Sequence, residues 1–271
     1  MERVKLNGVE LRYEVSGSGD PVLLISTGPI ADSFRPFVSQ QAMADRYRLI
    51  RYQQRRIDAT APRIVPVSFA EHAADAVALL DHLGVRRAHV AGHSTGASIA
   101  LQLAVDHPEV VHSLVLLEPP LMTVPSAGNF LQRAGPALAA YGRGNHEGAM
   151  AEFLSMVCSL DWESCRAHVE KHVPGGVVRA MQDADDFFGS YLPALSTWQF
   201  GSRQAAAISQ PVLSVVGTET ERLFAEGQEL LHSWFPQIED RTIEGVAHLL
   251  HLQRPEPVAR GVAEFLSRHP M

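Results

Sequence analysis

Short runs of apolar residues recur along the chain at the spacing of buried β-strands. Residues 9–15 alternate apolar and polar side chains, which predicts a half-buried antiparallel strand. Later runs are apolar without interruption, as expected of strands covered by helices on both faces. These runs lie at residues 22–25, 49–50, 88–91, 113–117 and 212–217, and a last strand is expected near 240–243. The pattern indicates a sheet that is mostly parallel.

Segments with apolar residues at helical spacing separate these strands. They lie at residues 32–46, 69–83, 97–105, 223–234 and 255–268. Strands that alternate with helices predict the α/β class, with a parallel sheet and helices on both of its faces.

The alternation stops after Pro120. From residue 121 to 207 the pattern is helical and contains no strand run, and we expect helices at residues 130–141, 146–159, 165–172 and 177–188. Because the strand and helix alternation then returns, residues 1–120 and 208–271 are expected to form one core domain. Residues 121–207 would be a helical cap, or lid, inserted into it.

Composition limits the partners that the protein could have. The 271 residues are 46% hydrophobic and carry a net charge of −7 without a block of Lys or Arg, which argues against nucleic acid or a membrane as partner. No apolar run reaches the roughly eighteen residues of a membrane span, and no signal peptide opens the chain, so a cytoplasmic location is expected. Cys158 and Cys165 are expected to be reduced. A small-molecule substrate is the expected partner, and a homodimer is left open.

The stretch from Val90 to Ser98 carries the strongest chemical signal. It predicts the end of a buried strand, a Gly-x-Ser-x-Gly turn around Ser94, and the start of a helix. Such a turn would hold Ser94 above the sheet, with the positive end of the helix dipole behind it. The serine would then be a nucleophile; the alternative is a tight turn that merely contains a serine.

With this turn, the inserted helices and the order of elements in place, the whole chain resembles the α/β-hydrolase superfamily, in its lidded branch of serine esterases and lactonases. Residues 22–29 stand where that family has an apolar strand followed by His-Gly-x-Pro, and residues 245–248 where it has Gly-x-x-His. The resemblance implies a mostly parallel eight-stranded sheet, a cap after the sixth strand and a Ser-acid-His triad.

His248 is the expected base, because it precedes the last helix and follows the serine in the chain order Ser, acid, His. His251, three residues later, is its rival, with a supporting or surface role as the alternative. The usual acid position after the seventh strand is Thr220, which has no carboxylate. Glu118 ends the sixth strand, where some lidded relatives place their acid, and we assign it that role over Glu219.

The resemblance also implies two backbone N–H groups that would stabilise an oxyanion. One belongs to Thr95, which follows the nucleophile. Alignment of residues 26–29 with His-Gly-x-Pro makes Gly28 the other donor, since Pro29 has no N–H.

Two segments remain open. Residues 51–60, which include Arg55, replace a glycine-containing turn of the family and could shape the pocket or form a surface turn. Aromatic residues of the cap could line a substrate cavity, although helix packing is the expected role of most; they are Trp162, Phe187, Phe188, Tyr191, Trp198 and Phe200.

The sequence therefore predicts a serine hydrolase that cleaves a small-to-medium, largely apolar carboxylic ester or lactone through Ser94, His248 and Glu118. No cofactor or metal is expected, because no His-Glu-x-x-His spacing and no glycine-rich phosphate loop is present. The same scaffold also serves carbon–carbon bond hydrolases, lyases and cofactor-free oxygenases, and receptors that bind without turnover. These alternatives stay open at this point.

Overall fold

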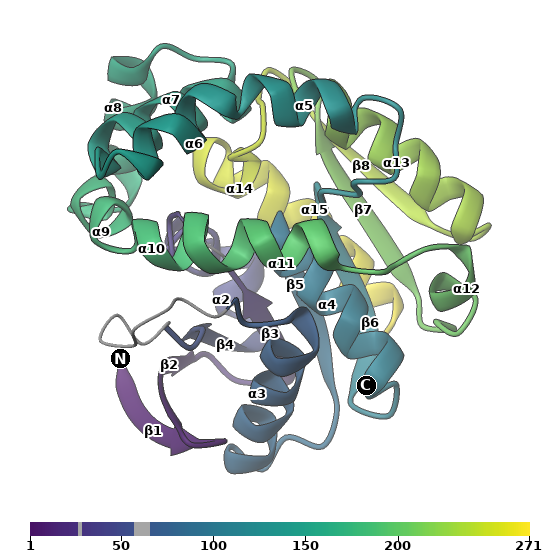
Figure 1. Cartoon of the computed structure of the whole chain (residues 1–271). Helices are drawn as coiled ribbons and strands as arrows, with labels where there is room; N and C mark the ends of the chain where they lie inside the picture. Colours follow the sequence, from purple (N-terminus) through teal and green to yellow (C-terminus); the bar gives the residue numbers. More distant parts are fainter. Residues whose placement is uncertain (27–28, 57–65) are drawn as a thin grey trace.

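The computed structural model describes residues 1–26, 29–56 and 66–271 (Figure 1). Its centre is one eight-stranded sheet with the strand order β1-β2-β4-β3-β5-β6-β7-β8. The strands are β1 (Glu2–Leu6), β2 (Val9–Ser16), β3 (Asp20–Ile25), β4 (Tyr47–Gln53), β5 (Ala88–His93), β6 (Val111–Leu117), β7 (Val212–Gly217) and β8 (Glu239–Ile243). β2 pairs antiparallel with β1 and β4, and every later pair is parallel. The predicted α/β class and mostly parallel sheet are confirmed.

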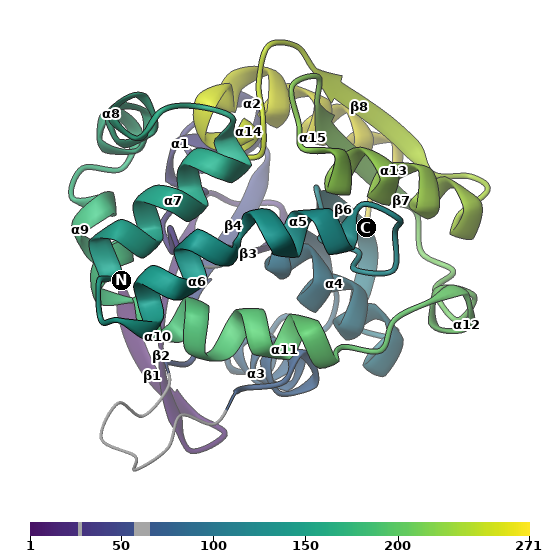
Figure 2. The same cartoon turned by 45° about the horizontal axis from the view of Figure 1, so that its top comes forward.

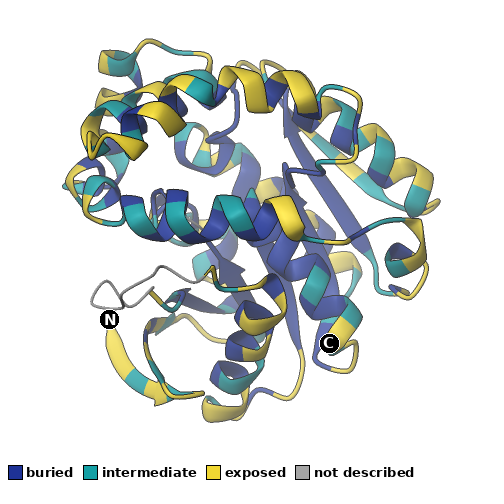
Figure 3. Ribbon diagram, viewed as in Figure 1, coloured by how far each residue is buried: buried dark blue, intermediate teal, exposed yellow. Residues whose placement is uncertain are grey.

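Helices cover both faces of the sheet because successive strand residues point to opposite sides. In β3, Leu23 and Ile25 join the cluster formed with α3 (Phe69–His82), α4 (Thr95–Asp106) and α13 (Arg222–Trp234). Val22 and Leu24 join the opposite cluster, with α1 (Arg35–Val38), α2 (Gln41–Ala44) and α15 (Pro255–Arg268). Figure 3 shows the resulting pattern, with buried strands between helices that are exposed on their outer sides.

The helix predicted over residues 32–46 is wrong as a single element. The structure divides these residues into α1 and α2, because Gln40 has an extended backbone with ψ 134°. The side chains of Ser39 and Gln40 both donate hydrogen bonds to the Pro36 carbonyl, at 2.9 and 2.8 Å. Side chains that satisfy a carbonyl in this way compete with continuation of the helix.

Helices fill the chain between β6 and β7, and no strand occurs there. They are α5 (Ala127–Arg133), α6 (Gly135–Gly142), α7 (His146–Cys158), α8 (Trp162–His172), α9 (Gly176–Gln182), α10 (Ala184–Asp186), the π-helical turn η1 (Phe187–Tyr191), α11 (Leu192–Thr197) and α12 (Ser202–Ala205). Figures 1 and 2 show α5, α6, α7 and α11 lying together across one end of the sheet. The helix expected over residues 177–188 is wrong as a single element, since it is interrupted at Asp183 and passes into η1.

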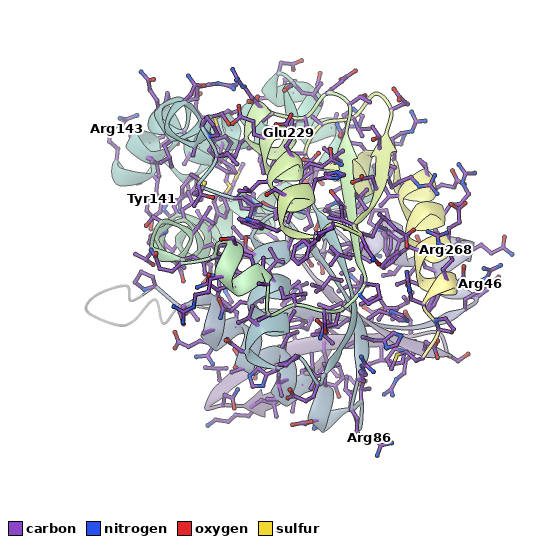
Figure 4. The ribbon with its side chains drawn as sticks, turned by 90° about the vertical axis from the view of Figure 1, so that its right-hand side faces the viewer. Arg46, Arg86, Tyr141, Arg143, Glu229 and Arg268 are labelled. Carbon is purple, nitrogen blue, oxygen red and sulfur yellow. The ribbon has the colours of Figure 1, made fainter. Side chains whose placement is uncertain are left out.

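A hydrogen bond connects two of the helices between β6 and β7. Tyr141 of α6, labelled in Figure 4, donates to Asp185 of α10 at 2.8 Å. Within the described ranges, none of the helices is long and apolar enough to cross a membrane.

Candidate active site

Ser94 occupies the turn between β5 and α4. Its φ of 54° and ψ of −128° lie in a region that non-glycine residues rarely adopt. The turn is possible because Gly92 has no side chain: a Cβ at this position would lie 2.3 Å from the Gly96 carbonyl oxygen. The backbone N–H of Ser94 donates to the Leu117 carbonyl at 2.9 Å, which holds the turn beside the end of β6. The local geometry is that of the predicted strand-turn-helix.

Glu118 directly follows β6 and is 2% exposed. Its Oε1 atom accepts a hydrogen bond from the Gly217 N–H at 2.8 Å, and its Oε2 atom lies 2.7 Å from His248 Nδ1. The residue has φ 47°, so this carboxylate is also held by an uncommon backbone conformation. The two oxygens are thus directed at two different partners.

His248 lies in the loop between β8 and α14 (Leu250–Gln253), and its ring is fixed from several sides. The Phe224 ring stacks on it at 4.0 Å between centroids, with an interplanar angle of 12°. The His93 Nε2 atom lies 2.8 Å from the His248 carbonyl oxygen, which anchors the backbone of the loop to the turn beside Ser94. Because Nδ1 faces Glu118, the other ring nitrogen, Nε2, is the one available to a substrate.

Burial sets the protonation of this pair. It raises the pKa of Glu118 above its usual value, against the opposing effects of the Gly217 N–H and the Thr220 hydroxyl. It lowers the pKa of His248 below its usual value, because the charged imidazolium loses its hydration. The neutral imidazole is therefore the resting form at neutral pH, as a general base requires.

Ser94 and His248 line the same small cavity of about 20 Å³. Apolar side chains make up most of its wall: Pro29, Ile30, Phe153, Leu154, Val157, Phe187 and Leu249. Ser33 and His93 are the other polar residues that line it. Phe187 lies on this wall, and the other five aromatic residues that the sequence suggested as cavity-lining residues do not.

The two alternative residues, Glu219 and His251, do not line the cavity of Ser94 and His248. Glu219 is exposed, and its N–H donates to the Val246 carbonyl at 3.0 Å. His251 is buried between the rings of Phe34 and His93, at 4.6 and 4.3 Å, and does not line the Ser94 cavity. The contact with His248 is made by Glu118.

Of the two backbone N–H donors expected to stabilise an oxyanion, the structure describes only that of Thr95. Thr95 is the first residue of α4, so its N–H belongs to the helix start, where backbone amides have no partner within the helix. Gly28 lies outside the described residues, and its role stays a prediction.

The Arg51–Thr60 segment is described only as far as Arg56. Arg55 donates two hydrogen bonds of 2.6 Å to Asp75 of α3. Arg56 forms ion pairs with Asp183 and Asp186, which connects the end of β4 to α10 and the residue before it. Neither arginine lines the Ser94 cavity.

Several residues of the site were not predicted from the sequence, among them Phe224, Phe153 and Ser33. The first two occupy apolar positions of helical patterns, which are typical of core residues in general. Ser33 lies in a segment expected to be an ordinary helix. No local sequence pattern predicts that these side chains lie beside Ser94 or His248.

Among the described residues, no group of three His, Cys, Asp or Glu side chains is arranged to hold a metal ion. Cys158 and Cys165 are free thiols with their Sγ atoms 3.6 Å apart. Of the exposed arginines labelled in Figure 4, Arg143 and Arg86 lie at opposite ends of the view, and Arg46 and Arg268 lie at its right-hand side.

Comparison with known proteins agrees with the fold. The family profile of the alpha/beta hydrolase fold matches residues 20–255, which is most of the chain. The chain belongs to the α/β hydrolase family. Its cavity with Ser94 and His248 lies at the end of β5, where the strand leads into the turn.

The individual relatives that this α/β hydrolase resembles are named for different reactions. It is 38% identical over 109 residues to "Putative carbamate hydrolase RutD" of Azorhizobium caulinodans, a match that covers 40% of each chain. The chain therefore matches less than half the length of this relative.

Solved structures match over nearly the full length. Est816, described as an N-acyl homoserine lactone degrading enzyme, is 25% identical with a TM-score of 0.73, over 98% of this chain and 100% of its own. A thermophilic esterase from Thermogutta terrifontis is 21% identical with a TM-score of 0.78, over 100% of both chains, and shows the shared fold.

Proposed function

We propose that this α/β hydrolase is a serine hydrolase that cleaves a small-to-medium, largely apolar carboxylic ester or lactone. The observation that supports this most directly is the 2.7 Å contact between Glu118 and His248, whose ring lines the same cavity as Ser94. A strained serine, a neutral buried imidazole and a carboxylate are the parts that nucleophilic acyl transfer needs.

In the first step, the Ser94 Oγ atom attacks the substrate carbonyl carbon while His248 Nε2 takes the hydroxyl proton. Glu118 accepts the Nδ1–H hydrogen bond, which keeps Nε2 free of a proton and stabilises the imidazolium that forms. The Thr95 N–H, with that of Gly28 as the second donor, stabilises the oxyanion of the tetrahedral intermediate. His248 then returns the proton to the leaving alcohol, and an acyl-enzyme on Ser94 remains.

In the second step, water attacks the acyl-enzyme and gives its proton to His248 Nε2. Collapse of the intermediate breaks the bond between the acyl carbon and Ser94 Oγ, which recovers the proton from His248. The products are a carboxylic acid and an alcohol from an ester, or a single hydroxy acid from a lactone, and the enzyme returns to its starting state.

The cavity supports the substrate class. Its walls are largely apolar, and no Lys, Arg, Asp or Glu is among the described residues that line it. A charged acyl group would therefore lose its hydration without gaining an ion pair. The lactone-degrading activity stated for Est816 is consistent with an ester or lactone.

A carbamate is the second candidate, favoured by the 38% identity to RutD over 109 residues. Its carbonyl would be attacked by Ser94 in the same way, with a carbamoyl-enzyme in place of the acyl-enzyme. A substrate panel of esters, lactones, carbamates and diketones would decide between these classes.

A fluorophosphonate probe tests the proposed nucleophile, because it phosphonylates a serine activated by a base. We expect covalent labelling of the folded wild-type protein, mapped to Ser94 by mass spectrometry, and no labelling of Ser94→Ala. Absence of labelling in the folded wild-type protein would contradict a serine hydrolase and favour a binding protein or non-covalent chemistry.

A further inference from the structure

Ser33 has a buried hydroxyl group without an internal partner. The residue lies in the connection between β3 and α1, where its N–H donates to the Ile30 carbonyl at 3.0 Å. Its side chain is 1% exposed, and within the described part of the chain its Oγ atom makes no hydrogen bond. A hydroxyl group in this state costs stability, because water no longer solvates it and no protein group replaces the water.

Ser26, at the beginning of the same connection, shows the usual arrangement. It is also buried, and its Oγ donates to the Ala31 carbonyl at 2.7 Å. The two serines therefore differ in role: Ser26 stabilises the connection, whereas the Ser33 hydroxyl makes no such bond. What distinguishes Ser33 is its location, since it lines the cavity of Ser94 and His248.

The other polar side chains on the cavity wall already have assigned contacts or roles. His93 Nε2 contacts the His248 carbonyl oxygen, His248 Nδ1 contacts Glu118, and Ser94 is the proposed nucleophile. Ser33 thus adds a polar group without an assigned contact to a wall that is mostly apolar. At about 20 Å³, the cavity holds about one water molecule, so Ser33 borders the same small space as Ser94.

We propose that Ser33 is a substrate-positioning residue whose hydroxyl donates a hydrogen bond to a second polar atom of the substrate, next to the carbonyl that Ser94 attacks. This inference rests on the proposed serine hydrolase function and narrows its substrate class. The preferred substrates are esters or lactones of small acids that carry an oxygen acceptor close to the scissile carbonyl. An all-carbon acyl group of equal size leaves the Ser33 hydroxyl unpaired in the complex.

Two esters of nearly equal shape test the inference: p-nitrophenyl methoxyacetate and p-nitrophenyl butanoate, which differ by an ether oxygen in place of a methylene group. The kcat and KM of each are measured for wild type, Ser33→Ala and a control, Ser98→Ala. Ser98 is a matched control because its hydroxyl is also buried and unpartnered, but it does not line the cavity.

For Ser33→Ala, we expect the ratio of kcat/KM for methoxyacetate over butanoate to fall about tenfold, the size of effect typical of one lost hydrogen bond. The fall should appear mainly as a higher KM for methoxyacetate, since the bond is made in both the ground state and the transition state. Ser98→Ala should keep the wild-type ratio. The intrinsic reactivities of the two esters cancel in this comparison between variants.

Thermal unfolding separates positioning from a structural role. Ser33→Ala should leave the Tm unchanged or raise it, because it removes an unpaired buried hydroxyl, whereas Ser26→Ala should lower it. An unchanged ester ratio in Ser33→Ala, or a Tm that falls as in Ser26→Ala, would overturn the positioning role alone. If wild type hydrolyses neither ester and the fluorophosphonate probe does not label Ser94, the proposed function fails together with the inference.

Discussion

The Glu118 Oε2 atom lies 2.7 Å from the Nδ1 atom of His248, although the two residues are 130 positions apart in the chain. Glu118 is also held by the Gly217 N–H at 2.8 Å, at the end of the neighbouring strand β7. The pair therefore depends on the parallel order β6-β7-β8, which brings the carboxyl ends of these strands to one edge of the sheet. In this protein the carboxylate that contacts His248 follows β6, and Thr220, after β7, contributes only a hydroxyl group beside it.

Glu118→Gln should lower kcat on an ester by about three to four orders of magnitude. The amide keeps the shape of the side chain but no longer stabilises the imidazolium, and its N–H₂ group favours the wrong tautomer of His248. Glu219→Gln is the control, because Glu219 is exposed, and it should retain wild-type turnover within a few fold. Steady-state kinetics of the two purified variants measure these changes in kcat. A large loss of kcat in Glu219→Gln alone would refute the assignment of Glu118 as the acid.

Phe187→Leu should shift ester preference toward longer acyl chains. Phe187 lines the Ser94 cavity, and the smaller side chain leaves additional space there. We expect the ratio of kcat/KM for an octanoate ester over an acetate ester to rise several fold. Phe188→Leu is the matched control: Phe188 is buried beside Phe187 but packs on Tyr141 at 5.1 Å and is not on the cavity wall. Equal shifts in both variants would show that loosened helix packing, rather than cavity size, sets the preference.

Local sequence patterns predict some residues of the candidate site and not others. Ser94 was predicted because strand, glycines, serine and helix start are adjacent in the chain. His248 was assigned from its order and from a family resemblance, and Glu118 was preferred to Glu219 as its partner because it ends the sixth strand. The contact between Glu118 and His248 joins residues that are 130 positions apart, and no local pattern encodes such a contact.

Phe224 and Ser33 were not predicted for the same reason, because their positions in the site depend on contacts between distant segments. Phe224 stacks on His248 because α13 packs across β7, but along the sequence it is one more apolar residue of an amphipathic helix. Ser33 was placed within a helix of residues 32–46, yet the structure has a turn at this position and two short helices after it. The side-chain hydrogen bonds of Ser39 and Gln40 to Pro36, which accompany that interruption, form only in the folded geometry.

Acidification should destabilise the protein steeply, because buried histidines resist protonation. Burial lowers the pKa of His72 and of His89 to about 4, compared with about 6.5 in the unfolded chain. Between pH 6.5 and 4 the unfolded state therefore binds more protons, so the free energy of unfolding falls as the pH falls. Glu118, whose pKa is raised to about 7, acts in the opposite direction between pH 7 and 4.5.

His72→Phe isolates one of these contributions. Both ring nitrogens of His72 lack a partner within the described residues, and the ring stacks on Tyr191 at 5.1 Å, so phenylalanine can replace it. On going from pH 7.5 to pH 5, the variant should lose about 1 to 2 kcal/mol less stability than wild type, measured by urea unfolding. Tyr191→Phe, which alters the same stack without removing a histidine, should keep the wild-type pH dependence. An identical pH dependence in His72→Phe would show that His72 does not take part.

Gly92→Ala should abolish the turn that presents Ser94. A Cβ at this position would lie 2.3 Å from the Gly96 carbonyl oxygen and 2.6 Å from the Ala97 nitrogen, and these are backbone atoms that no side-chain rotation can move. We expect a loss of at least about 3 kcal/mol in the free energy of unfolding, or failure to fold. Gly128→Ala in α5 is the control, because its Cβ would meet nothing within 4 Å and alanine favours a helix by about 0.5 to 1 kcal/mol. Urea unfolding of the two variants should therefore give changes of opposite sign. A folded Gly92→Ala protein with wild-type probe labelling at Ser94 would contradict the close approach of β5 and α4 on which the proposed nucleophile depends.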